Sequence, residues 1–166
     1  MTEAVLAGLL RDDEVEALAD LAGFVWRRHY PGIISLEQID YMLARRYRPA
    51  FIRQTMARGD KWDAARGQGL LLGFSHSYPM GGGDAKLDKL YVHPDWQRHG
   101  IGRLLLERVL GHARLWHCGR LVLRVNRNNT LAIAAYGKYG FAVATEIQED
   151  IGGGFLMDDF VMTRNV

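Results

Sequence analysis

The sequence predicts an α/β fold built on a mixed sheet, and three observations support this prediction. Strand-like segments alternate with amphipathic segments of helical period along the chain, which is typical of α/β proteins. Two glycine-rich turns, Gly67-Gln68-Gly69 and Gly152-Gly153-Gly154, each join two strand-like segments and therefore predict antiparallel hairpins. The length of 166 residues, without repeats or a linker, is that of a single domain spanning 1–166.

The first third of the chain predicts one strand and three helices. Asp12 or Asp13 is a candidate cap for the first helix, and Pro31-Gly32 ends it. Ser35 and Gln38 have the spacing of a capping box, in which the Gln38 side chain reaches back to the cap residue. The expected elements are a strand at 4–9 and helices at about 12–30, 35–47 and 48–59.

The remainder of the chain predicts six strands and two further helices. Pro94 ends one strand, and a long helix with an apolar stripe begins at about Gly100. Leu121, Leu123 and Val125 alternate with polar or smaller residues, so they share one face of a strand. The expected strands are 61–66, 69–78, 85–93, 120–126, 141–149 and 154–163, and the expected helices are about 100–117 and 130–139.

Composition narrows the class of protein. Hydrophobic residues make up 48% and charged residues 24% of the chain, which is typical of globular proteins and excludes a disordered chain. The net charge of +2 is too even to indicate a nucleic-acid partner. Cys118 is the single cysteine, so no disulfide forms within the chain, as in a reducing compartment. The seven-residue apolar run at 4–10 lacks a basic start, so we expect no signal peptide, no membrane span and a cytoplasmic location.

The most informative stretch is a strand followed by a turn and a helix that begins at Gly100 and Gly102. A helix N-terminus offers unpaired N–H groups and a partial positive charge, so it can bind a phosphate. Arg98 and Arg103 add positive charge there. Leu105 replaces the third glycine of the dinucleotide fingerprint. The glycine pair alone therefore fits either a phosphate site or a tight turn that binds nothing.

Two motifs stand in order between Leu87 and Phe141. The first is Leu87-x-x-Leu90-Tyr91-Val92-x-Pro94 followed by Gln97-Arg98-His99-Gly100-Ile101-Gly102. The second is Asn126-x-x-Asn129-x-x-Ala132-x-x-x-Tyr136-x-x-x-Gly140-Phe141. Together they resemble the GNAT superfamily of acyl-CoA-dependent N-acetyltransferases, whose Q/R-x-x-G-x-G/A loop holds the coenzyme A pyrophosphate. The resemblance implies a mixed, mostly antiparallel central sheet of about seven strands flanked by helices.

The resemblance also implies acetyl-CoA as the co-substrate, without a metal, and assigns its contacts by position. Backbone groups at Tyr91 and Val92 would pair with the pantetheine arm and polarise the acetyl carbonyl. Asn129 would contact the cofactor arm. Tyr136 would also touch the cofactor and act as general acid toward the leaving thiolate, because the reference pKa of a phenol lies near that of a thiolate. The pyrophosphate would lie on the loop formed by Gln97, Arg98, His99, Gly100, Ile101, Gly102 and Arg103.

The acceptor amine needs a base, because a reference pKa near 10.4 keeps an alkyl amine charged at neutral pH. Asp88 lies in the strand before the glycine loop, and alternation places it on the same face as Leu90. Glu37 lies in the first turn of the second helix, a region that borders the acceptor in GNAT folds. Asp88 and Glu37 are therefore the candidate bases, with His29, His93 or a chain of waters as alternatives.

Asp158 and Asp159 stand in the last predicted strand among large apolar residues. Strand alternation places them on opposite faces, and a buried carboxylate needs a partner. Either they pair with nearby arginines or backbone groups or lie at a strand bulge, or one of them lines the acceptor pocket and attracts a cationic amine. Tyr30 is a candidate wall of the same pocket. A similar acidic stretch occurs in some bacterial polyamine acetyltransferases.

The sequence thus predicts an enzyme that transfers an acetyl group from acetyl-CoA to a primary amine of a small molecule, such as a polyamine, in a ternary complex. The alternatives are a protein N-terminal or lysine acetyltransferase and a non-catalytic acyl-CoA-binding module. We expect no nucleic-acid or membrane partner, and a homodimer is an expectation of the family. His112, His117 and Cys118 lack the spacing of a zinc site. The arginines at 45, 46, 48 and 53 are typical of a solvated face, and the alternative is that they meet the cofactor's phosphates or an acidic partner.

Overall fold

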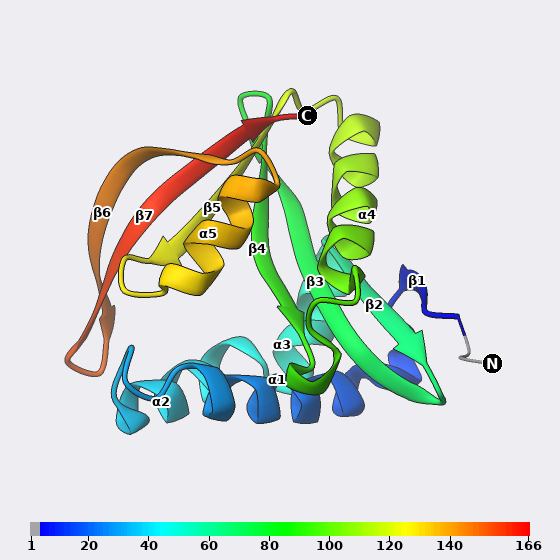
Figure 1. Ribbon diagram of the computed structural model, residues 1–166, viewed down its shortest axis with the longest axis horizontal. Coiled ribbons are helices and arrows are strands. Elements are labelled where there is room, and N and C mark those ends of the chain that lie inside the picture. Colours follow the sequence, from blue (N-terminus) through cyan, green and yellow to red (C-terminus); the bar gives the residue numbers. More distant parts are fainter. Residues whose placement is uncertain (1–3) are drawn as a thin grey trace.

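The computed structural model describes residues 4–166, which form a seven-stranded sheet with helices on both faces (Figure 1). The strands are β1 (Leu6–Leu9), β2 (Lys61–Gly67), β3 (Leu70–Gly81), β4 (Asp84–Val92), β5 (Arg120–Asn126), β6 (Ala142–Gly152) and β7 (Phe155–Asn165). The helices are α1 (Val15–His29), α2 (Leu36–Arg46), α3 (Pro49–Arg58), α4 (Ile101–Leu115) and α5 (Thr130–Lys138). The predicted α/β class and the order of elements along the chain are confirmed.

The sheet opens between β4 and β5. Its order is β1-β2-β3-β4-β5-β7-β6, and every neighbouring pair is antiparallel except β4 with β5. These two strands pair only through residues 84–86 and 120–122. Beyond that short pairing, β4 runs toward α1 while β5 turns away with β6 and β7 (Figure 1). The sheet therefore divides into two halves at the carboxyl end of β4.

Helices α1–α3 and helix α4 cover opposite faces of β2–β4. Two consecutive residues of β2 show this, because strand neighbours point to opposite faces. Ala64 packs into the core that contains Leu18 of α1, whereas Ala65 packs with Ile101 and Leu105 of α4. Both faces of this half of the sheet are therefore buried, and the first turn of α4 is held against the end of β4.

Two predicted helix caps differ from the structure. Asp12 and Asp13 lie in a 3₁₀ turn, Asp12–Glu14, that precedes α1, so neither caps that helix. The hydroxyl of Ser35 does accept the Gln38 N–H at 3.1 Å and caps α2. The Gln38 side chain does not reach back, because its amide donates to the Leu156 carbonyl of β7 at 3.2 Å. A tertiary contact between α2 and β7 has replaced half of the capping box.

Candidate active site

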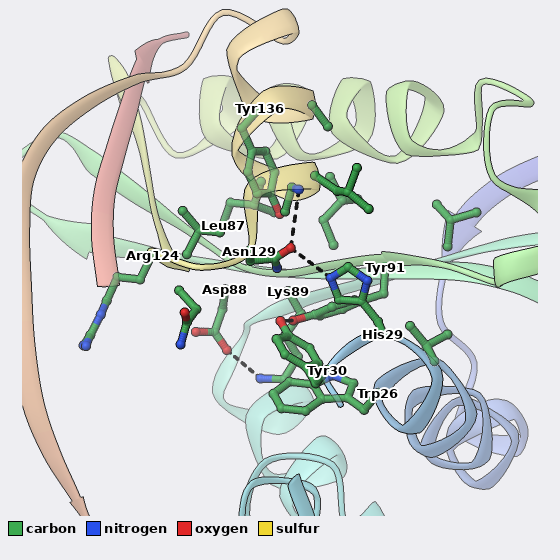
Figure 2. A pocket seen from close by; sticks show the side chains of 18 of the residues that line it. Trp26, His29, Tyr30, Leu87, Asp88, Lys89, Tyr91, Arg124, Asn129 and Tyr136 are labelled. Atoms are coloured by element: carbon green, nitrogen blue, oxygen red, sulfur yellow. Dashed lines mark hydrogen bonds and ion pairs between the residues drawn. The ribbon is translucent and has the colours of Figure 1, made fainter. Parts of the chain in front are cut away.

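A cavity of about 900 Å³ lies where β4 and β5 diverge. Its walls come mainly from β4, the first turn of α4, α5, the end of α1, α2, and the strands β5, β6 and β7. Figure 2 shows side chains from these elements converging on it: Tyr136 from α5, His29 and Tyr30 from α1, and Asp88 and Tyr91 from β4. The opening of the sheet has thus produced one site lined by both halves of the fold.

The glycine loop predicted to bind an anion forms the first turn of α4. Gly100 is the N-cap with a φ of +79°, and Arg98 before it has a φ of +64°; glycine adopts this left-handed conformation without strain. Gly100, Ile101, Gly102 and Arg103 line the cavity. The N–H groups of a first helical turn have no carbonyl partners within the helix. The positive end of α4 therefore faces the cavity and can hold an anion there.

The remaining loop residues divide between the cavity and the surface. Gln97 and Arg98 line the cavity. His99 does not, because its ring Nδ1 lies 2.8 Å from the Gln97 carbonyl oxygen and the side chain folds back on its own loop. Gly102 has little room for a side chain, since an added Cβ would lie 2.9 Å from the Tyr139 hydroxyl.

A β-bulge in β4 determines where Asp88 points. The β3 partners of Leu87 and Lys89 are consecutive residues, so Asp88 is an extra residue in the ladder. A bulge interrupts the alternation of side chains. Leu90 packs on the side of α4, whereas the Asp88 carboxylate meets Arg46 of α2. The prediction that Asp88 and Leu90 share a face is therefore wrong, because it assumed an uninterrupted strand.

The Asp88 carboxylate is held by three nitrogen-bearing side chains. Arg46 Nη2 lies 3.0 Å away, Lys89 Nζ 2.6 Å and His76 Nδ1 3.1 Å. Burial opposes the ionisation of Asp88, but the charge of Lys89, the His76 hydrogen bond and the charge of Arg46 outweigh it and hold the pKa well below its usual range. A carboxylate with such a low pKa is a weak base. The three neighbouring nitrogen atoms therefore make Asp88 an unfavourable proton acceptor.

Three of the tyrosines that line the cavity are the predicted site residues Tyr30, Tyr91 and Tyr136. The hydroxyls of Tyr30 and Tyr91 are hydrogen bonded at 2.7 Å. Tyr136 packs edge-on against Phe141, with ring centroids 5.7 Å apart. Burial raises the pKa of all three phenols, so each stays protonated at neutral pH. Tyr136 is therefore a protonated donor at the cavity wall, and Tyr30 forms a wall of the cavity too.

Asn129 joins the start of α5 to the end of α1. It is the N-cap of α5, and its Oδ1 accepts the Ala132 N–H at 3.4 Å. The same oxygen lies 2.9 Å from His29 Nε2 across the cavity (Figure 2). The two contacts fix the Asn129 side chain at the cavity wall, at the position where the cofactor arm is expected.

Asp158 and Asp159 are adjacent in β7, and their side chains point to opposite faces of that strand. Asp158 pairs with Arg127 at 3.0 Å and does not line the cavity. Asp159 lines the cavity, is 1% exposed and lies 3.2 Å from Arg124 Nε in an ion pair that makes no hydrogen bond. Among residues 4–166, neither Asp159 carboxylate oxygen has a hydrogen-bond partner, and burial raises its pKa. Asp159 is thus a buried carboxylate with free acceptor capacity at the cavity.

Basic residues at the cavity were missed by reasoning from the sequence. Arg46 belongs to the arginine run expected on a solvated face, yet its side chain turns inward to Asp88. Its position four residues after the buried Met42 is a signal that could have identified it. Lys86 of β4 and Arg124 of β5 also line the cavity; Lys86 is at the last position where the two strands pair, and Arg124 lies beyond it, where they diverge.

The other candidates lie elsewhere. Glu37 is exposed and does not line the cavity. His93 accepts the Asp95 N–H at 3.1 Å in the turn before α4, and His112 pairs with Asp63 at 2.8 Å. Within residues 4–166 there is no group of three or more potential metal ligands. In the same range, no helix is long and apolar enough to cross a membrane.

Comparison with known proteins identifies N-acetyltransferases as relatives of this chain. The model of the acetyltransferase (GNAT) family matches residues 18–141. The spermidine N(1)-acetyltransferase of Thermoplasma acidophilum is 25% identical over 154 residues, which cover 88% of this chain and 91% of that protein. The [ribosomal protein bS18]-alanine N-acetyltransferase of Escherichia coli is 40% identical over 62 residues, which cover 37% of this chain and only 42% of that protein.

The solved structures agree on the fold. The crystal structure of the PaiA N-acetyltransferase of T. acidophilum, in complex with coenzyme A, superposes with a TM-score of 0.84 at 24% identity, over 98% of this chain and 99% of that one. YncA of Salmonella typhimurium, with its cofactor acetyl-CoA, superposes with a TM-score of 0.70 at 17% identity, over 98% and 94%. At these identities the likeness establishes the fold.

Proposed function

The chain belongs to the GNAT acetyltransferase family, and from this premise we propose that it transfers the acetyl group of acetyl-CoA to a primary amine of a small molecule. Both substrates occupy the one cavity, and the amine attacks the thioester directly. The thioester supplies an activated acyl group. Everything else that the reaction needs comes from the side chains and backbone groups around the cavity.

Acetyl-CoA binds at the end of the cavity formed by the first turn of α4 and by α5, which we call the cofactor end. The N–H groups at Ile101, Gly102 and Arg103 bind the pyrophosphate, because they lack helical partners and line the cavity. Arg98 adds charge from the loop. Asn129 holds the arm of the cofactor beside β4. The left-handed Gly100 supports this role, since it starts the helix without a side chain over the anion site.

Proton transfers at both ends accompany the reaction. A bond forms between the amine nitrogen and the acetyl carbon, the carbon–sulfur bond breaks, and the Tyr136 phenol gives its proton to the leaving sulfur; the N–H proton lost as the amide forms restores the phenol through solvent. Before the attack, the ammonium form of the amine loses one proton to a carboxylate. Asp159 suits this role better than Asp88, because burial raises the pKa of Asp159 whereas Lys89 and Arg46 keep the pKa of Asp88 low.

One observation carries the proposal: the N-terminus of α4, the protonated Tyr136 and the free carboxylate of Asp159 line the same cavity. The test is release of the CoA thiol from acetyl-CoA in the presence of polyamines, amino acids, aminoglycosides or short peptides. We expect release with one chemical class of amine. No release with any class, while acetyl-CoA still raises the Tm, would indicate an acyl-CoA-binding module without catalysis.

A second function is favoured by the match of 62 residues to a ribosomal-protein alanine N-acetyltransferase. In that case the acceptor is the α-amine of a protein rather than of a small molecule. Peptides with free and blocked N-termini distinguish the two functions. Turnover of peptides in preference to small amines would replace the first proposal with this one.

A further inference from the structure

The acceptor end of the cavity, the part lined by α2, β4, β5, β6 and β7 away from α4, carries an excess of positive charge. We infer that the acceptor amine also carries a carboxylate, as an amino acid does; the inference rests on the function proposed above. The basic side chains of the acceptor end are Arg45, Arg46, Lys86, Lys89 and Arg124, and the acidic ones are Asp88, Glu149 and Asp159.

Asp159 is surrounded by these positive charges. Arg124 Nε lies 3.2 Å from its carboxylate, and Arg46 and Lys86 also attract it electrostatically. Its oxygens nevertheless make no hydrogen bond within residues 4–166. An ammonium group can take these oxygens as acceptors. Once bound there, however, the ammonium lies near three basic side chains: Arg46 is paired with Asp88 and Arg124 with Glu149, whereas Lys86 is paired with no carboxylate among the described residues.

Lys86 has no carboxylate partner in the described part of the chain. It makes no hydrogen bond or ion pair there, because Asp88 is engaged by Arg46 and Lys89 and Glu149 is paired with Arg124. Burial lowers the pKa of Lys86, so its charge is destabilised until an anion binds.

Arg124 is paired with Glu149 and Asp159 but keeps one nitrogen that no carboxylate occupies. Its Nη2 is buried and has no hydrogen-bond partner among the described residues. A carboxylate on the acceptor would pair with Lys86 and with this free Arg124 group, while the amine of the same molecule pairs with Asp159. A second ammonium in place of the carboxylate would meet only repulsion from both. The acceptor expected here therefore differs from the spermidine of the T. acidophilum relative's name.

Matched amines test the inference. Initial rates are measured with lysine and cadaverine, and with tyrosine and tyramine, because the members of each pair differ only in the carboxylate; spermidine is the polyamine. We expect kcat/KM to be about tenfold or more higher for the carboxylated member, as expected of one charge-assisted contact. Lys86→Met should raise KM for that member by a similar factor and should leave KM for its partner unchanged or lower, because the variant also removes a positive charge that repels an ammonium. Lys61→Met, which alters a lysine away from the cavity, should change neither.

The possible outcomes distinguish failure of this inference from failure of the acetyltransferase function on which it rests. Preference for cadaverine, tyramine or spermidine over the amino acids would overturn the carboxylate requirement and leave the acetyltransferase function standing. Equal effects of Lys86→Met on both members of a pair would overturn the role of Lys86. Absence of turnover with every amine and peptide would overturn the proposed function itself, and the inference with it.

Discussion

Gly102→Ala is the change that most directly tests the cofactor end of the cavity. Gly102 lies in the first turn of α4 and lines the cavity. An added Cβ would lie 2.9 Å from the Tyr139 hydroxyl, and beyond that oxygen its nearest neighbours are Tyr139 Cζ at 3.8 Å and Val92 Cγ2 at 3.9 Å. The methyl group thus has two separable effects: it crowds one hydroxyl, and it occupies space at the N–H groups proposed to hold the pyrophosphate.

The first effect lowers the free energy of unfolding and the second lowers the affinity for acetyl-CoA, and a second substitution separates them. Overpacking costs about 1–3 kcal/mol, while alanine is about 1 kcal/mol better than glycine within a helix. Gly102→Ala should therefore lower the free energy of unfolding by roughly 0–2 kcal/mol. Tyr139→Phe removes the crowded oxygen and should restore the loss. The affinity for acetyl-CoA should fall about 10- to 100-fold in both backgrounds, since at least one charge-assisted hydrogen bond to the phosphates is lost.

The assay is calorimetric titration with acetyl-CoA beside urea unfolding, for Gly102→Ala alone and combined with Tyr139→Phe. Gly111→Ala is the matched control, because it lies on the same helix and its added Cβ meets nothing within 4 Å. That control should gain about 1 kcal/mol in stability and bind acetyl-CoA as the unaltered protein does. Unchanged acetyl-CoA affinity in Gly102→Ala would refute the placement of the pyrophosphate at α4.

Three further predictions concern the proton chemistry and the buried charges. Tyr136→Phe should lower kcat about 10²- to 10⁴-fold with little change in acetyl-CoA affinity; unchanged kcat would remove Tyr136 from the mechanism. Asp88→Asn should lower stability by about 3–5 kcal/mol in urea unfolding, because it leaves Arg46 and Lys89 without their anion; a loss of kcat without loss of stability would restore Asp88 as the base. Burial lowers the pKa of Lys89 from 10.5 to about 8, so the unfolded chain binds more protons in that range. Stability should therefore rise by about 2 kcal/mol between pH 7 and 9.5 relative to Lys89→Met, and parallel pH profiles would contradict this.

The fold and the position of the glycine loop could be predicted from the sequence because their signals are local. Gly100 and Gly102 follow a strand and begin a helix, as the sequence predicts. The hairpin turns 67–69 and 152–154 likewise mark the ends of their strands. Each of these features depends on neighbours in the chain, so no knowledge of the tertiary structure was needed.

The acceptor end could not be predicted, because its geometry depends on events distant in sequence. One extra residue in β4 turns Asp88 toward α2, and periodicity contains no signal for a bulge. Arg46 lines the cavity from α2, which is far from β4 and β5 in sequence. Arg124 lines it from the part of β5 that no longer pairs with β4. The alternation argument did separate Asp158 from Asp159 correctly, but it did not show which one faces the cavity.

The central claim is that one cavity brings acetyl-CoA and an amine together for direct acetyl transfer. Quantifying CoA release and acetylated amine in the same reaction, by thiol titration and mass spectrometry, tests it most directly. We expect one acetylated amine for each CoA released, and we expect both products to be lost together in Tyr136→Phe. CoA release without acetylated amine, or acetylation that survives in Tyr136→Phe at the unaltered rate, would contradict it.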